Sequence, residues 1–370
     1  MKKMVMILMG LAVLIGSQPV FCQEKNENVI QIAVLLDTSN SMDGLINQAK
    51  AQLWKMVNEF ALARKNGRIP QLQIALYEYG NNNIPQQDGY IRQVAGLTGD
   101  LDRISDELFR LTTNGGDEYC GEVIAKAIKG LNWSNQKDIL KIIFIAGNEP
   151  FTQGSQDFRK ACKEAISQGI IVNTIFCGSR SEGISGGWKE GADLADGMYA
   201  NIDQNEQVAY IAAPQDDEIN RLGQNLNQTY VAYGAKGQAA KELQAKQDAN
   251  AQSVAPAVMA ERSLAKASAQ YSNAVWDLVD ASVQDPALLE KLEKEQLPAE
   301  MQKMNKAEQK KYIAEKSKER KDLQAKINKL NTERQKYVLE QQKKNAVKTL
   351  NQAMLDSIRE QAQKKKYVFE

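Results

Sequence analysis

The chain has 370 residues, 43% of them hydrophobic, which suffices for a sizeable core in one or two domains. It contains no histidine, and this excludes Ser-His and Cys-His nucleophilic machinery and removes the commonest zinc ligand. Residues 236–370 hold 26 Lys and Arg against 19 Asp and Glu, a net of +7, whereas residues 1–235 hold 21 against 27, a net of −6. This asymmetry indicates either a polar partner for the basic part or contact between the two parts.

The first 22 residues have the pattern of a signal peptide. Lys2 and Lys3 precede an apolar run at 5–15, which is too short to span a bilayer as a mature helix. We expect plain cleavage after Cys22 and not its lipidation, because Phe21 is bulky where lipoprotein signals require a small residue. No later segment reaches 18 consecutive apolar residues, so the sequence predicts an exported protein without a transmembrane span. The periplasm is the expected location, with secretion or surface attachment as alternatives.

Residues 29–235 alternate between apolar strands and amphipathic helices. Strands are expected at 29–36, 72–79, 90–97, 139–146, 170–177 and 198–202, and helices at 43–64, 101–111, 118–131, 156–167, 188–194 and 216–226. Asp100 and Gly169 stand where a helix N-cap and C-cap are expected. The alternation predicts a doubly wound α/β domain, with a mostly parallel sheet and helices on both faces.

Residues 236–370 form a different region, rich in Lys, Glu, Gln and Ala. Helices are expected throughout it, with breaks near Pro256, Asp285-Pro286 and Pro298. Its basic end, at 364–366, is expected to meet an acidic partner, an anionic envelope surface or the acidic front domain, and not nucleic acid.

The run from 303 to 344 has no Pro or Gly. Leu323, Leu330 and Tyr337 repeat every seven residues in it, whereas Arg334 interrupts the companion seam. The pattern favours a long amphipathic helix or a short coiled coil through which chains self-associate. A solvated helix with ordinary charge pairs explains it equally well.

Three cysteines remain in the expected mature chain: Cys120, Cys162 and Cys177. An odd number cannot pair completely within one chain. Three interpretations stay open, namely a Cys120–Cys177 bridge, a Cys162–Cys177 bridge and three buried thiols.

The strongest local feature is the segment 37–41, with the sequence DTSNS. It follows the first buried strand directly and opens the first helix, which is the edge where parallel sheets place their sites. Asp37, Ser39 and Ser41 offer one carboxylate and two hydroxyls at alternating positions. Hard oxygens that converge in this way suit Mg²⁺ or Mn²⁺, with Ca²⁺ as an alternative. Helix capping would explain one of these residues but not all three.

The segment VIQIAVLLDTSNSM resembles the first element of the von Willebrand factor A (VWA) family, and the resemblance extends over residues 29–235. In that family the D-x-S-x-S motif forms a metal-ion-dependent adhesion site, abbreviated MIDAS. The resemblance implies that Asp37, Ser39 and Ser41 form the first metal-binding loop.

Two further loops of this chain depart from the family pattern. The threonine that usually follows a Gly-Gly turn is replaced by acidic residues after Gly115-Gly116, and Asp117 is the expected ligand, with Glu118 as an additional candidate. The aspartate of the third loop falls on Gly147, and Glu149 is the nearby candidate ligand or rim residue.

The resemblance implies a binding module and not an enzyme. The cation would keep one coordination position open, and an acidic group of a protein partner would fill it. The alternative is a structural envelope protein in which the helical tail drives association and the metal site is vestigial.

Overall fold

The computed structural model describes residues 28–40, 42–202, 210–345 and 350–369. The expected signal peptide, Cys22 and Ser41 therefore lie outside the described residues. Within the described part, no helix has the length and apolar character that crossing a membrane requires.

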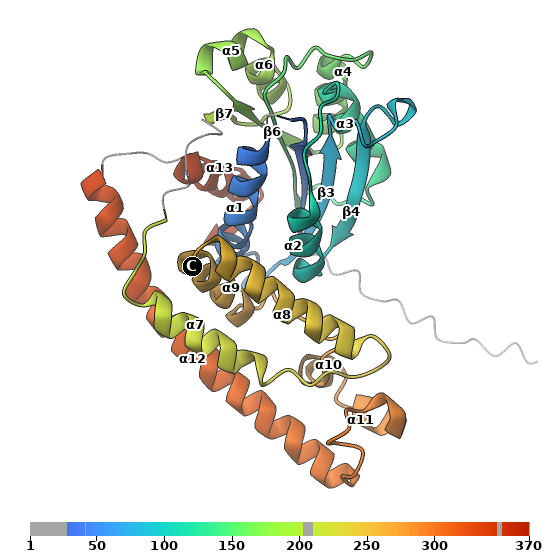
Figure 1. The fold of residues 1–370 in the computed structure, drawn as a ribbon, viewed down its shortest axis with the longest axis vertical. Helices are drawn as coiled ribbons and strands as arrows, with labels where there is room; N and C mark the ends of the chain where they lie inside the picture. The colour runs from blue at the N-terminus through green and yellow to red at the C-terminus, as the bar shows by residue number, and fades with distance from the viewer. Residues whose placement is uncertain (1–27, 41, 203–209, 346–349, 370) are drawn as a thin grey trace, which may run out of the picture.

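We call the described residues up to 235 the front part of the chain and those from 236 onward the tail. A six-stranded sheet forms the centre of the front part (Figure 1). Its order is β4-β3-β1-β5-β6-β7, and every pairing is parallel except that between β3 and β4 at the edge. The strands are β1 (Val29–Asp37), β3 (Gln71–Tyr79), β4 (Ile91–Thr98), β5 (Leu140–Gly147), β6 (Ile170–Cys177) and β7 (Tyr199–Ile202). The prediction of a mostly parallel α/β sheet is confirmed.

Helices cover both faces of this sheet, because successive side chains of a central strand point to opposite sides. Ala33 and Leu35 of β1 belong to one core and Ile30 and Ile32 to the other. The first core is closed by α3 (Cys120–Gly130), α4 (Phe158–Ser167), α5 (Arg180–Ser185) and α6 (Trp188–Asp193). The second is closed by α1 (Asp43–Ala61), α2 (Leu101–Arg110) and α13 (Leu350–Lys364).

The rest of the chain is helical, as predicted. It contains α7 (Asp216–Asn227), α8 (Gly237–Val254), α9 (Pro256–Ala267), α10 (Leu278–Gln284), α11 (Leu288–Lys291) and α12 (Lys306–Asn345), with the 3-10 turn η2 (Lys294–Gln296). The other 3-10 turn, η1 (Gln86–Asp88), lies between β3 and β4. Pro256 begins α9 after an extended Ala255, Asp285 ends α10, and Pro298 lies in the non-helical segment between η2 and α12, so the three expected breaks are confirmed.

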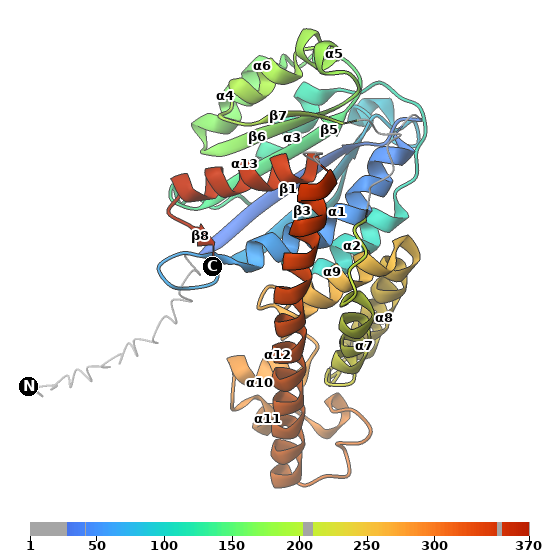
Figure 2. The same ribbon diagram turned by 90° about the vertical axis from the view of Figure 1, so that its left-hand side faces the viewer.

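Two connections between distant segments were not predicted. Helix α7 was expected to close the α/β domain, but it packs against α9 and α12, and α13 contacts β7 and α1 (Figure 2). The expected helix 43–64 ends at Ala61, and β2 (Ala63–Arg64) pairs instead with β8 (Val368–Phe369) near the C-terminus. Both differences depend on partners far away in the sequence, which a local pattern does not identify.

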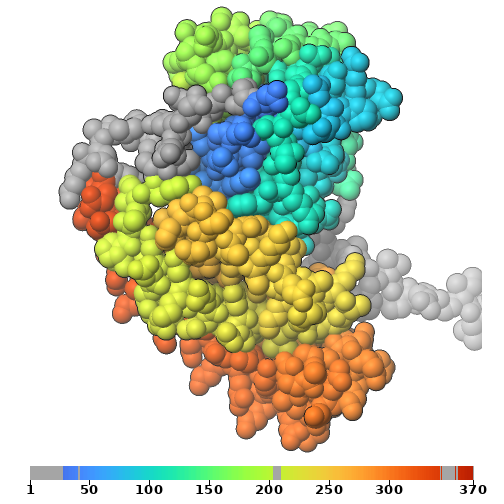
Figure 3. Space-filling model, in the orientation of Figure 1, coloured from blue at the N-terminus to red at the C-terminus, as the bar shows by residue number. Residues whose placement is uncertain are grey.

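Acidic residues of the front part contact basic residues of the tail, as one of the two interpretations of the charge asymmetry predicts. Four ion pairs join acidic residues of the front part to basic residues of the tail: Asp102–Arg262, Asp106–Lys246, Asp216–Arg334 and Glu59–Arg359. Figure 3 shows the tail residues packed directly against those of α1 and α2. Of the two explanations offered by the sequence, contact within the chain is the one that the structure shows.

Arg334 belongs to the buried stripe of α12 and does not interrupt it. Its guanidinium donates to Asp216 at 2.6 Å and to Glu261 at 2.7 Å. Leu323 and Ile327 lie on the same side of the helix and are buried, and α12 packs against α7 and α9. The seven-residue pattern therefore reflects packing within one chain in this structure.

We expect Ile327→Ala to lower the free energy of unfolding by about 3 kcal/mol, because Ile327 is fully buried and its removal leaves a cavity. Leu339→Ala on the same helix is the control, since Leu339 is 53% exposed and should change little. Urea denaturation at several protein concentrations measures both. A midpoint that rises with concentration in the wild type would show instead that α12 is stabilised by self-association.

The structure agrees with the third interpretation of the cysteines, namely three buried thiols. Cys120, Cys162 and Cys177 are all buried free thiols, and no bridge joins them. Burial raises the pKa of the Cys162 thiol to about 12, so it has little tendency to ionise. The two bridges considered from the sequence are thus absent from this structure.

Candidate functional site

Asp37 is the last residue of β1 and lies at the carboxyl edge of the sheet. Its backbone is level with Tyr79 on β3, while the preceding residue pairs with Ala146 on β5. The chain leaves β1 toward β3 on one side and later returns to β5 on the other. This is the topological switch point at which open parallel sheets bind their ligands.

The first loop leaves two buried oxygen atoms unused. Asp37 Oδ1 accepts the backbone N–H of Ser39 at 2.8 Å, but Asp37 Oδ2 and Ser39 Oγ have no hydrogen-bond partner among the described residues. Asp37 is fully buried and Ser39 is 5% exposed. Because buried polar atoms without partners are costly, this pair indicates a missing ligand such as a cation.

The loop conformation is held by neighbouring polar side chains. Asn81 Nδ2 donates to the carbonyl of Thr38 at 3.3 Å and to that of Thr112 at 2.8 Å, which ties the first loop to the second. The Thr38 hydroxyl donates to Glu78 or to the Tyr79 carbonyl, each at 3.3 Å. The positions of Asp37 and Ser39 are thus set before any ligand binds.

Glu118 is the acidic residue of the second loop that reaches the site. Its side chain is buried and passes over Gly80, where an added Cβ would lie 2.7 Å from Glu118 Cγ and 2.9 Å from Asp37 Oδ1. Gly80 also has a φ of +76°, so both the close contacts and the backbone conformation disfavour a side chain there. Glycine at this position lets the two carboxyl groups approach each other.

Asp117, the ligand expected from the sequence, is placed differently. It is exposed and accepts a hydrogen bond from the Tyr119 hydroxyl at 3.0 Å. The loop that carries both acids has no regular secondary structure before α3, so no periodicity could tell which of the two side chains turns inward.

In the third loop, Gly147 stands where the family pattern has an aspartate, and its contact with Tyr79 explains this difference. A Cβ at Gly147 would meet the Tyr79 hydroxyl at 2.5 Å and Asp37 Oδ2 at 3.0 Å. The fully buried Tyr79 donates to the Ala146 carbonyl at 2.9 Å and so holds its hydroxyl against this strand end. An aspartate at 147 would have to displace it. Tyr79 is a site residue that the sequence analysis missed, because its pattern marked it only as the end of a strand.

The carboxyl groups of the site resist ionisation. Burial raises the pKa of Asp37 to about 7, and the negative charge of Glu149 adds to this, while the hydrogen bond from the Ser39 backbone N–H opposes it. Burial and then the charge of Asp37 raise the pKa of Glu118 to about 8. The half-buried Glu149 therefore lies within electrostatic reach of both. A cation among them would favour their charged forms.

The donor chemistry fits a hard divalent cation. Asp37 and Ser39 offer free oxygen atoms, Glu118 supplies a second carboxylate beside them, and Ser41 lies outside the described residues. Within the described part of the chain, no three His, Cys, Asp or Glu side chains are arranged to hold a metal. The candidate set thus depends on hydroxyl oxygens as well as carboxylates, which suits Mg²⁺ or Mn²⁺ better than zinc.

Comparison with known proteins identifies the class of domain. Residues 31–186 match the sequence profile of the von Willebrand factor type A domain. Together with the sheet order, this match defines a VWA-like fold, which a helical region follows. No curated protein is similar enough to the chain to count as a match.

Several solved structures are similar over about half of the chain. The conserved hypothetical protein BatB from Bacteroides thetaiotaomicron is 17% identical, with 47% of this chain and 90% of that one covered and a TM-score of 0.36. The SpRpn10 VWA domain is 17% identical, covers 52% and 95%, and has a TM-score of 0.37. Proximal thread matrix protein 1 from the mussel byssus, with a zinc-occupied MIDAS motif, is 14% identical, covers 48% and 43%, and has a TM-score of 0.36.

Proposed function

We propose that this is an exported protein whose VWA-like domain binds a protein partner through a divalent cation. VWA domains commonly mediate metal-dependent protein–protein interaction and are generally not enzymes. The observation that carries the proposal is the pair of buried oxygen atoms, Asp37 Oδ2 and Ser39 Oγ, that have no partner among the described residues. Export is supported by the signal-peptide pattern of the first 22 residues.

The cation would be held by Asp37, Ser39, Ser41 and Glu118, and its charge would attract an acidic group of the partner. Glu118 and Glu149 add negative charge near the site, so they weaken this attraction compared with a site that has one carboxylate. Asp117 and Glu149 would contribute at the rim.

A crosslinked pull-down of the wild type from envelope extract, with and without chelator, tests the proposal. We expect capture of a partner that chelator abolishes and that Asp37→Ala also abolishes, with an unchanged circular dichroism spectrum. Capture that persists in both conditions would refute a cation-dependent interface.

The alternative, in which the tail drives association and the metal site is vestigial, requires surfaces of the tail that remain free. Deletion of residues 236–370 is a poor test of it, because this removes α13 from the sheet and also the partners of Asp102 and Asp216. Charge reversals at exposed residues of α12 test it without unfolding the front part. Association lost in these variants but retained in Asp37→Ala would favour scaffolding.

The pH dependence of stability tests the state of the carboxyl groups. Asp37 and Glu118 have folded pKa values of about 7 and 8, above their ordinary values of 3.8 and 4.5, so the folded state binds their protons more tightly than the unfolded state does. The stability of the metal-free protein should therefore fall as the pH rises from about 4 to 8. Thermal melts in chelator measure this fall. Mg²⁺ should reverse it, and Asp37→Asn should reduce it to the part that Glu118 contributes.

A further inference from the structure

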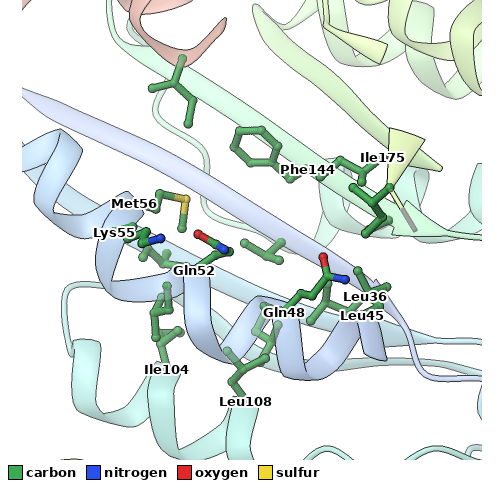
Figure 4. A pocket seen from close by; sticks show the side chains of 18 of the residues that line it. Leu36, Leu45, Gln48, Gln52, Lys55, Met56, Ile104, Leu108, Phe144 and Ile175 are labelled. Atoms are coloured by element: carbon green, nitrogen blue, oxygen red, sulfur yellow. The ribbon is translucent and has the colours of Figure 1, made fainter. Parts of the chain in front are cut away.

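An apolar cavity of about 130 Å³ lies within the core that α1, α2 and α13 form with the sheet. Its floor consists of side chains from the central strands, among them Val34 of β1. Figure 4 shows Phe144 of β5 and Ile175 of β6 beside it. Met56 of α1 and Leu355 of α13 line its sides. A cavity of similar size in another protein accommodates benzene, so this one has room for a short hydrocarbon chain.

The cavity arises from the way in which this face of the sheet is covered. Helix α7, which follows β7, packs on α9 and α12, and α13 contacts β7 and α1 instead. Val34 lies in the middle of the central strand yet is only half-buried, whereas Ala33 and Leu35 on the opposite face are fully buried. On α1, the small Ala49 is half-buried at the same place. Unfilled apolar space is unfavourable, because the side chains around it lack contacts on one side.

Polar groups from one side of α1 border this cavity. Gln48, Gln52 and Lys55 follow one another at intervals of four and three residues, so they lie along one face of the helix. In Figure 4 the Lys55 amine is directed toward the amide oxygen of Gln52. Among the described residues, no hydrogen bond or salt bridge is made by the Lys55 amine, while the neighbouring Gln52 has an amide that can donate.

The acid near Lys55 is already engaged elsewhere. Glu261 accepts hydrogen bonds from Arg334 at 2.7 Å and from Asn58 at 2.7 Å. Burial lowers the pKa of Lys55, and Glu261 and Arg334 act on it in opposite directions. A half-buried amine beside an apolar cavity would thus gain from an anionic partner that brings its own hydrocarbon.

We propose that this cavity binds the alkyl chain of a medium-chain fatty acid, with the carboxylate held by the Lys55 amine and the Gln52 amide. The hydrocarbon would fill the apolar space above Val34. The carboxylate meets the one cationic side chain among the described residues that line the cavity. This binding is separate from the cation site at Asp37 and does not depend on it.

Calorimetric titration with octanoate and with 1-octanol tests the two parts of the proposal. We expect the wild type, in chelator, to bind one octanoate and to bind octanol more weakly. Lys55→Met keeps the apolar stem but removes the charge. It should weaken octanoate binding by about tenfold or more and leave octanol binding unchanged, because a charge-assisted hydrogen bond is lost. Equal weakening of both ligands, or none, would overturn the role of Lys55.

A second variant tests the location. Ala49→Leu places a larger side chain into the cavity and should abolish binding of both ligands without lowering the thermal midpoint. Ala314→Leu, at an exposed position of α12, is the matched control and should bind like the wild type. A photoreactive diazirine octanoate should label peptides of α1 or α13 in the wild type, which keeps the test decisive if Ala49→Leu does not fold. Labelling elsewhere, or no binding at millimolar octanoate, would refute the proposal.

Discussion

Replacement of Asp37 by Asn should abolish stabilisation of the protein by Mg²⁺ or Mn²⁺. The asparagine can still accept the Ser39 backbone N–H, but it lacks the second carboxylate oxygen that has no partner among the described residues. At a cation concentration roughly 100-fold above its Kd, the wild type should gain about 2.7 kcal/mol of stability. Thermal melts with cation and with chelator measure this gain as a rise of several degrees, and the variant should show none.

The same experiment on Glu118 and Asp117 distinguishes which of these two acidic residues binds the cation. Glu118→Gln should weaken the stabilisation by cation, because the Glu118 carboxyl is buried beside Asp37. Asp117→Asn is the matched control and should keep it, because Asp117 is exposed and bonded to Tyr119. If Asp117→Asn removes the stabilisation while Glu118→Gln preserves it, the second loop binds the cation through the residue that the sequence favoured.

Thermal melts cannot report cation binding by a variant that is already unfolded in chelator. Calorimetric titration with Mn²⁺ measures binding directly in that case. We expect Asp37→Asn to be at least as stable as the wild type without metal, since a buried carboxyl with a raised pKa no longer has to ionise. Undiminished Mn²⁺ binding in this variant would exclude Asp37 as a ligand.

The sheet and its site edge could be predicted because their signals are local. Each parallel strand is an apolar run, and the run 170–177 coincides with β6 residue for residue. Asp37 follows such a run directly, so its position at the sheet edge depends on nothing distant. Asp100 was likewise predicted as an N-cap, and its side chain does accept the Arg103 backbone N–H.

The remaining features depend on partners that are distant in the sequence. From the sequence alone, Arg334 interrupts the seven-residue apolar pattern of α12. In the structure it is buried because it pairs with Asp216 and Glu261. The return of α13 to the sheet is supported by hydrogen bonds between Gln361 and the buried Asn173, 188 residues earlier. No period or motif encodes such a pairing, and it was therefore not predicted.

Replacement of Arg262 by Met should destabilise the whole chain by about 3–5 kcal/mol, because it removes the cationic partner of the buried Asp102 and one of the two cationic partners of Asp248, which keeps Lys266. Arg262 is fully buried and donates to Asp102 at 2.8 Å and to Asp248 at 2.5 Å. Its guanidinium lies over the Trp54 ring, 4.6 Å from the centroid. One side chain on α9 thus contacts α1, α2 and α8, so its loss should separate the tail from the sheet.

Urea denaturation measures this effect, and Arg221→Ala is the control because its pair with Glu218 is exposed and should leave stability unchanged. Arg262→Lys should fall between the wild type and Met, because an ammonium keeps the charge but cannot donate to Asp102, Asp248 and the Gln244 carbonyl in the same geometry. In a double variant with Asp102→Asn, part of the loss should be recovered, since the buried carboxylate that lost its cationic partner is gone. Stability equal to wild type in Arg262→Met would mean that the ion pairs of Arg262 contribute nothing net to the packing of the tail on the sheet.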